Sequence, residues 1–223
     1  MTSAEMLARI GVLVDETPGS STFYIIDDAY RFLTSGQYEV ANYFLNLYRK
    51  MREVKRNVML PFALQTLLKS KTATLAETAD TIQFPTDYWE YVSLMYSHTS
   101  GDRYPVRIRP HNDLQNFFKE NSFAGQNTDA HDYYANIIED FGGFQMSGES
   151  SSGSSYRLNY IKKPTDIRAS VQPVLGANTH DAIVIYAAAM LMIKDERWQE
   201  SNALMQVFIT KLSQIEVFGN VNP

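Results

Sequence analysis

The strongest constraint on this fold is an apolar block of twelve residues near the end of the chain, Ala182 to Ile193. The hydroxyl of Tyr186 is its only polar side-chain group. A surface helix of this composition would leave half of its apolar surface in water, at a cost of about 25 cal/mol per Å². The block must therefore be covered all round. In a chain of 223 residues, we expect another copy of the protein or a partner to supply part of that cover, which favours assembly over catalysis.

Composition excludes several classes of function. The formal net charge is −5 and the isoelectric point is near 5.4, which argues against sequence-independent binding to a phosphate backbone. The absence of cysteine excludes disulfides, thiolate catalysis and cysteine-ligated zinc. The apolar block is shorter than the ~20 residues that span a bilayer, and Met1 to Glu5 lack the basic start of a secretion signal. We expect a protein made in the cytoplasm that does not bind a membrane.

Apolar residues recur at helical spacing at both ends of the chain. At the N-terminal end the pattern predicts helices over residues 3–15, 21–35 and 37–56, with Ser35 and Gly36 ending the second of them. At the C-terminal end it predicts the apolar helix 180–194 and an amphipathic helix 196–217. The sequence therefore predicts an α+β fold, mainly α, in which the N-terminal helices and the two C-terminal helices form one bundle.

The middle of the chain has the alternating patterns and the turn residues of strands. Strands are expected around 92–96, 106–108, 133–138 and 141–146, with a short helix over 110–122. A serine and glycine run at 147–155 is expected to form the flexible tip of a long hairpin that returns through 156–161. We thus expect a single domain, 1–223, with a helical bundle (1–56 and 179–217) and an inserted β-rich excursion (57–178).

Chemistry-bearing residues are sparse in this chain. The four histidines do not have a recognised metal-ligand spacing, although His98, His111 and His131 with nearby aspartates leave open a small metal-dependent hydrolase. No phosphate-binding loop and no nucleophile elbow are present. The sequence therefore predicts no catalytic residue, no resident metal and no cofactor. A cellular helical module that binds a partner through residues 1–56 is the other alternative.

The one basic cluster lies at the end of the predicted helix 37–56. Positive charge at a helix C-terminus stabilises the helix dipole, which is sufficient to explain the cluster. An acidic partner or passing DNA is the functional alternative. The residues are Arg49, Lys50, Arg52, Lys55 and Arg56.

Four segments resemble, in their order along the chain, the head-to-tail adaptor proteins (connector or ring proteins) of tailed bacteriophages. Phe84 to Tyr88 is similar to the family's hydrophobic-Pro-x-Asp entry into a strand, and Tyr156 to Pro164 to its tyrosine-bearing strand closing on proline. Asn178 to Val184 opens an alanine-rich helix, and Asp195 to Trp198 leads into the last amphipathic helix. The long hairpin and the acidic balance point to ring proteins of crAss-like phages as a subgroup.

This resemblance implies a structural virion protein located at the neck, the junction of head and tail. Such proteins form a ring, usually a dodecamer, under the portal protein, contact the next tail or ring protein, and surround a channel through which DNA passes without sequence-specific binding. Only 218–223 follow the last predicted helix, whereas some relatives grip the portal with a longer C-terminal arm. Candidate interface residues are Tyr156, Tyr160, Ile183, Tyr186, Met190, Trp198 and Phe208.

Overall fold

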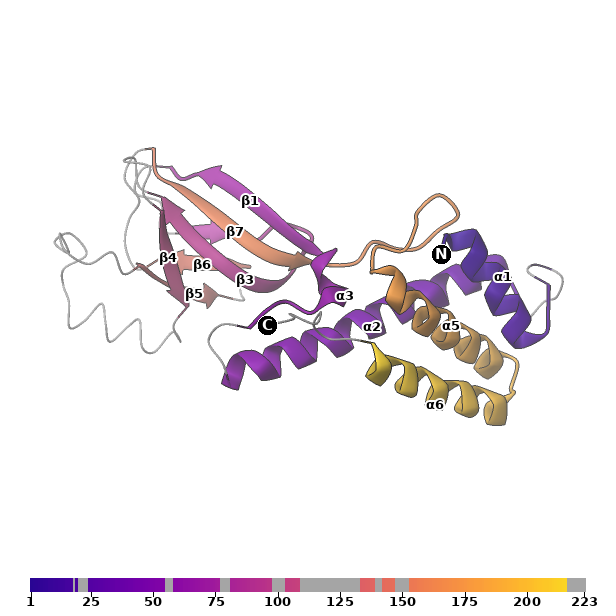
Figure 1. Ribbon diagram of the computed structural model, residues 1–223. Coiled ribbons are helices and arrows are strands. Elements are labelled where there is room, and N and C mark those ends of the chain that lie inside the picture. Colours follow the sequence, from indigo (N-terminus) through magenta and orange to yellow (C-terminus); the bar gives the residue numbers. More distant parts are fainter. Residues whose placement is uncertain are drawn as a thin grey trace. The chain divides into compact units, whose positions relative to one another are not determined.

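The computed structural model describes residues 1–17, 19, 24–54, 58–76, 81–97, 103–108, 133–138, 142–146 and 153–215. The chain divides into two compact units (Figure 1). The helical unit combines Met1–Leu67 with Pro164–Pro223, and the sheet unit comprises Leu68–Lys163. The sheet unit is thus an insertion between the two halves of the helical unit.

The helical unit contains two N-terminal helices and two C-terminal ones, together with two short helical turns that lie before and after the inserted sheet unit. Its first helix begins with a capping box, in which Thr2 and Glu5 each accept a hydrogen bond from the other's backbone N–H. The elements are α1 (Ser3–Val14), α2 (Ile26–Val54), α3 (Phe62–Gln65), the 3₁₀ turn η1 (Ala177–Thr179), α5 (His180–Lys194) and α6 (Trp198–Gln214).

The expected break at Ser35 and Gly36 is wrong, because α2 runs unbroken for 29 residues. Gly36 instead lies where α2 approaches α5. A Cβ atom at this position would be 3.0 Å from the carbonyl oxygen of Ile183 and 3.1 Å from Cδ1 of Tyr186. A mid-helix glycine costs about 1 kcal/mol, and the close packing of two helices offsets it. Gly36 therefore lets α2 pack closely against α5 and does not end the helix.

The apolar helix α5 is covered within one chain. It packs against α1, α2 and α6, and ten of its fifteen residues are buried. Figure 1 shows these helices gathered around it. The expectation that a second molecule must complete its cover is therefore wrong. The composition of α5 requires burial all round, and three helices from both ends of the same chain provide it.

The segment that follows the sheet unit in the chain is bound to α2 by hydrogen bonds with side chains of that helix. Gln37 is fully buried, donates a hydrogen bond to the carbonyl of Thr165 (2.9 Å) and accepts one from the backbone N–H of Val174 (2.8 Å). The hydroxyl of Tyr38 donates to the carbonyl of Pro164 (2.9 Å). These bonds satisfy the backbone of a stretch without regular structure, so that it can lie against a helix.

The sheet unit is a curled, mixed sheet of seven strands (Figure 1). Its order is β1-β7-β3-β4-β5-β6-β2, and only the β4–β5 pair is parallel. The strands are β1 (Leu68–Thr74), β2 (Thr81–Gln83), β3 (Tyr88–Ser97), β4 (Arg103–Ile108), β5 (Tyr133–Ile138), β6 (Gly143–Met146) and β7 (Ser155–Lys162).

The prediction of a mainly helical fold is wrong, since 49% of the described residues are helical and 27% lie in strands. The prediction of a long hairpin is also wrong. β5 pairs with β6, but β7 does not return alongside them and instead lies between β1 and β3. Alternation in the sequence identifies a strand, but it carries no information about which strand lies beside it. The predicted helix 110–122 and the predicted tip at 147–155 fall mostly outside the described residues.

Aromatic side chains fill the core of the sheet unit. Phe84 and Tyr88 stack with ring centroids 4.0 Å apart, and Phe84 meets Phe144 edge-on at 4.9 Å. The hydroxyl of Tyr160 donates to Asp87 (2.8 Å), which also accepts from Lys69 of the edge strand β1 (2.8 Å). Lys69 is opposite Tyr160, so this lysine shares the core-side face of the sheet. A charged side chain that points inward on an edge strand, as Lys69 does on β1, disfavours pairing with further strands.

Candidate interaction surface

The seven candidate interface residues are not all accessible. Tyr156, Tyr160, Ile183 and Phe208 are buried in the cores of their units. Tyr186 and Met190 are half-buried on α5. Only Trp198 is exposed, with 58% of its surface accessible. The structure thus leaves Trp198, at the start of α6, as the accessible member of the set.

Helix α6 presents one packed face and one open face. Ser201, Phe208 and Leu212 are buried on the packed face, where Phe208 meets Tyr186 of α5 with ring centroids 5.3 Å apart. Outside the packed face, Ile209 is 56% and Val207 44% exposed. Trp198 and Ile209 are eleven residues apart, so they lie on the same side of the helix, whereas Val207 lies on nearly the opposite side. Trp198 and Ile209 together leave apolar surface in water, which is typical of a contact with another protein. These two residues are called the α6 outer face below.

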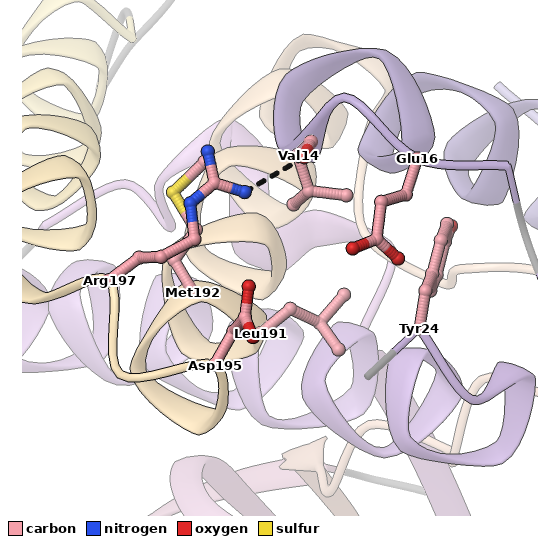
Figure 2. A pocket seen from close by; sticks show the side chains of 7 residues that line it. All are labelled: Val14, Glu16, Tyr24, Leu191, Met192, Asp195 and Arg197. Carbon is pink, nitrogen blue, oxygen red and sulfur yellow. Dashed lines mark hydrogen bonds between the residues drawn. The ribbon is translucent and has the colours of Figure 1, made fainter. Parts of the chain in front are cut away.

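Arg197 joins the start of α6 to the end of α1. Its guanidinium donates to the carbonyl oxygen of Val14 (3.0 Å), one of the last carbonyls of α1, as Figure 2 shows. It also donates to both carboxylate oxygens of Glu200, one of them at 3.0 Å. Hydrogen bonding to Glu200 raises the pKa of Arg197, despite partial burial that lowers it. A cation here satisfies a helix end that has no intrahelical partners.

The pocket in Figure 2 is too small for a ligand. Its volume is about 10 Å³, roughly the room for one water molecule. On one side lies Tyr24, whose hydroxyl donates to the carbonyl of Leu7 (2.5 Å). Burial raises the pKa of Tyr24 to about 12, so this phenol stays protonated and has no acid–base role near neutral pH.

Carboxylates gather near this pocket, and the sequence analysis missed them. Asp15 and Glu16 follow α1, and Asp195 and Glu196 follow α5. Asp15 and Glu196 both adopt the left-handed conformation, with φ of 59° and 58°. With Glu200 these residues form what is called the acidic end below. The signal was present as two acidic pairs, each placed where a helix was predicted to end.

The outer face of the sheet carries arginines that the sequence analysis did not single out. Met95 of β3 lies opposite Pro105 of β4 on one side and opposite Arg157 of β7 on the other. Arg103 and Arg107 are two residues before and after Pro105, so they share its face. All three arginines and Pro105 are exposed, and Met95 is half-buried. These five residues are called the basic sheet face below.

The basic cluster on α2 lies only partly within the described residues. Arg49 and Lys50 are exposed, and the guanidinium of Arg52 lies 5.4 Å from the centroid of the Tyr48 ring. Lys55 and Arg56 lie outside the described residues.

Metal chemistry finds no support in the part of the chain that the structure describes. That part contains no group of three or more His, Asp or Glu side chains placed to hold a metal ion. His98, His111 and His131 lie outside it. The ring of His180, which is described, hydrogen-bonds the Met1 amine (2.9 Å) and the carbonyl of Leu175 (3.0 Å). Its position is explained by packing.

A larger hollow of about 370 Å³ lies between the start of α5 and the end of α6. Asp181 and Lys211 are its charged lining residues, and Asp181 already pairs with Arg9 of α1 (2.5 Å). No nucleophile or base converges with them among the described residues that line the hollow.

Comparison with known proteins identifies the family. The family model described as SU10 adaptor protein matches residues 1–220. The chain belongs to the SU10 adaptor family. This is a family of phage head-to-tail adaptors, so the resemblance inferred from the order of four segments is confirmed. No curated protein matches the chain.

Membership in the SU10 adaptor family carries a coarse functional assignment. The protein is a structural adaptor of a bacteriophage, it interacts with other head or tail proteins, and its place is the virion. None of the described helices is both long enough and apolar enough to cross a bilayer.

Proposed function

We propose that this protein assembles into a ring at the neck of the virion, where it joins the portal protein to the next tail component and surrounds the channel for DNA. The observation that carries this proposal is the match of the SU10 adaptor family over residues 1–220. A part that must hold two other parts together needs interfaces rather than a reactive site. The two hollows described above hold no convergent set of catalytic side chains, which is in keeping with such a role. We infer a non-enzymatic protein without a cofactor.

The α6 outer face is the surface that we assign to contacts between neighbouring subunits. Trp198 heads this face, and tryptophan is enriched among residues that dominate binding energy. Tyr186 and Met190, half-buried on the neighbouring α5, can add to the contact at its margin. Ile183 and Phe208 would act beneath this surface, by holding its shape, and Tyr156 and Tyr160 would do the same for the surface of the sheet unit. Contacts that repeat head to tail and close on themselves generate rings, with a dodecamer implied by the resemblance.

Arg49, Lys50 and Arg52 at the end of α2 are the residues that we assign to an acidic partner or to the passing DNA, together with Lys55 and Arg56. Phosphate contacts of this kind carry no sequence information. This assignment predicts weak, salt-sensitive contact rather than stable binding.

The proposal is tested by the mass of the purified protein over a range of concentrations, alone and with the portal protein of the same phage, followed by imaging. We expect closed rings, either alone or on the portal. A double variant, Trp198→Ala with Ile209→Ser, should weaken ring formation. The matched control is Val12→Ser, because Val12 is 81% exposed on α1 and lies outside the α6 outer face. A protein that stays monomeric in the presence of portal contradicts the proposal.

A further inference from the structure

We propose that the basic sheet face binds the acidic end of the neighbouring copy, so that each contact in the ring joins the sheet unit of one subunit to the helical unit of the next. This inference rests on the ring proposed above. It extends the contact assigned to the α6 outer face, because Trp198 lies between the carboxylates of the acidic end, and it gives that contact a defined charge. The occupant of the sheet face is therefore a second copy of this chain.

The sheet face has an apolar centre within a basic rim. Met95 and Pro105 are directly opposite each other, and Arg157 continues the same row on β7. Arg103 and Arg107 lie in the rows on either side, with Cα atoms about 13 Å apart at roughly 3.3 Å per residue. A central apolar pair within charged side chains has the anatomy of a protein interface, in which a less polar core is surrounded by a polar rim.

The other residues in the rows of these arginines are neutral and polar. The next row along the face holds Leu68, Ile161 and the one carboxylate among its described positions, Glu90. That composition stands out in a chain with 25 acidic and 20 basic residues. Several of the polar side chains bond to each other: Asn159 donates to Ser93 (2.8 Å), and Ser70 donates to Asn159. The polar positions are Ser70, Thr72, Thr74, Ser93, Ser97, Ser155 and Asn159, as the strand register shows.

The acidic end has the opposite charge and its own apolar centre. Asp195, Glu196 and Glu200 flank the exposed Trp198 in the sequence. Asp15 and Glu16 follow α1, and Glu16 lines the same small pocket as Asp195 and Arg197. The dipole makes negative charge unfavourable at that C-terminal end of α1, whereas Asp195 and Glu196 come directly before α6, whose N-terminal end favours it. The stability of α1 therefore does not explain Asp15 and Glu16. The five carboxylates also exceed the charge of Arg197, which bonds Glu200, so the acidic end keeps a negative charge that suits a basic partner.

The two surfaces are complementary in chemistry. An indole framed by carboxylates can lie on a methionine and a proline framed by arginines, and the arginines can then contact both the carboxylates and the ring face. Because both surfaces belong to every copy, the contact is heterologous and can repeat around a closed ring. Charge complementarity of this kind steers association and suppresses incorrect pairings.

Duplex DNA is the other ligand that three arginines and a row of hydroxyls could contact. The net charge of −5 disfavours it, because long-range repulsion from the rest of the protein opposes a phosphate backbone. Three phosphate contacts also give little affinity at physiological salt. The observations therefore favour the second copy.

The first test reverses the charge of the sheet face and then restores charge complementarity by reversing the acidic end as well. Arg103→Glu with Arg157→Glu should weaken self-association by about tenfold or more, because close charge pairs at interfaces couple strongly. A second variant carries Glu196→Arg and Gln199→Arg and keeps the native sheet face. Mixing the two variants should restore association between unlike copies, because each altered surface then meets one of opposite charge. Lys71→Glu with Lys162→Glu is the matched control, since it makes the same charge change at two positions on the opposite side of the sheet. Thermal unfolding of each variant confirms that it is folded.

The second test uses the absence of native cysteine. Thr72, opposite Arg157 on the sheet face, and Gln199, next to Glu200 of the acidic end, are both exposed. A mixture of the single variants Thr72→Cys and Gln199→Cys should form heterolinked dimers under mild oxidation, and far fewer homolinked ones. The Arg103→Glu and Arg157→Glu changes should suppress that link.

The outcomes distinguish the proposed ring from the proposed contact between the basic sheet face and the acidic end. Rings that form normally despite the charge reversal, without heterolinked dimers, overturn this inference and leave the ring intact. A wild-type protein that neither self-associates nor assembles on portal overturns both. Binding of a labelled duplex that depends on Arg103 and Arg157, with unchanged self-association, assigns the face to DNA and also overturns the inference.

Discussion

The two units differ in how their cores are built along the chain. The sheet unit is one continuous segment, Leu68–Lys163, and its aromatic core is contributed entirely from within it. The helical unit needs both ends of the chain, because α5 is covered by α1 and α2 from the opposite end. Ser3 bonds Gln172 (2.6 Å), and Lys194 pairs with Asp28 (2.6 Å), across more than 160 residues. An inserted domain can therefore be autonomous while its host is not.

The largest expected effect is on excised fragments. Residues 68–163 should retain a sheet and unfold cooperatively, because their core is self-contained. Residues 164–223 should not fold, because α5 alone exposes apolar surface that α1 and α2 cover in the intact chain. Circular dichroism during urea unfolding measures both. A C-terminal fragment that unfolds cooperatively, or a sheet fragment that does not, breaks the comparison between the units.

Within the helical unit, α5 and α6 should respond very differently to truncation. Ile183 is fully buried, so Ile183→Ala should lower the free energy of unfolding by about 2–5 kcal/mol through lost contacts and a cavity. Ile209→Ala, at a residue that is 56% exposed on α6, should stay within about 0.5 kcal/mol. Chemical denaturation of the monomer measures both.

A comparable loss in the two variants would show that α6 is covered in the monomer, and it would remove the basis for the α6 outer face.

Local structure could be predicted from the sequence wherever it depends on neighbours along the chain. The helices predicted over 3–15 and 180–194 correspond to α1 and α5, since periodicity and capping residues are local signals. The break at Gly36 was wrong because the role of that glycine depends on Ile183, almost 150 residues away. The apolar composition of α5 predicted burial correctly, but not which helices would provide it.

The candidate site was harder to predict for the same reason. Tyr156 and Tyr160 were chosen by residue type, yet β7 is a central strand and both side chains point into the core. Trp198 was found because it begins an amphipathic helix. The basic sheet face could not be found, because Arg103 and Arg157 become neighbours only through the strand order.

The contacts of Arg197 give a smaller, more local effect on the helical unit. Arg197→Ala should cost about 1.5–3 kcal/mol, the usual range for hydrogen bonds to a charged group. This range applies because the change leaves the carbonyl of Val14 without its partner. Arg168→Ala is the control, since Arg168 pairs with Asp166 at 3.5 Å on an exposed surface, and such pairs contribute about 0–1 kcal/mol. Equal losses in the two variants would mean that Arg197 is no more than a surface ion pair.

The smallest expected effect is a difference in acid sensitivity between the units. Burial lowers the pKa of His180 in the helical unit below its ordinary value of 6.5, and the nearby Met1 amine adds to this. The unfolded chain therefore takes up this proton first, so the stability of the helical unit falls as the pH drops below 6.5. In the sheet unit, burial raises the pKa of Asp87, but hydrogen bonds from Lys69 and Tyr160 outweigh it and hold that pKa below 3.8. The stabilisation by Asp87 persists at pH values above 3.8 and is lost only in stronger acid.

Each unit has one tryptophan, so the difference can be measured directly. Trp198→Phe leaves Trp89 as the reporter of the sheet unit, and Trp89→Phe leaves Trp198 as the reporter of the helical unit. Urea unfolding between pH 6.5 and 4.5 should show a declining midpoint for the helical unit, and His180→Gln should flatten that decline, because glutamine can still donate to the carbonyl of Leu175 without gaining a charge. A decline that persists in His180→Gln would place its origin elsewhere, and parallel declines in both reporters would mean that the two units unfold as one despite their separate cores.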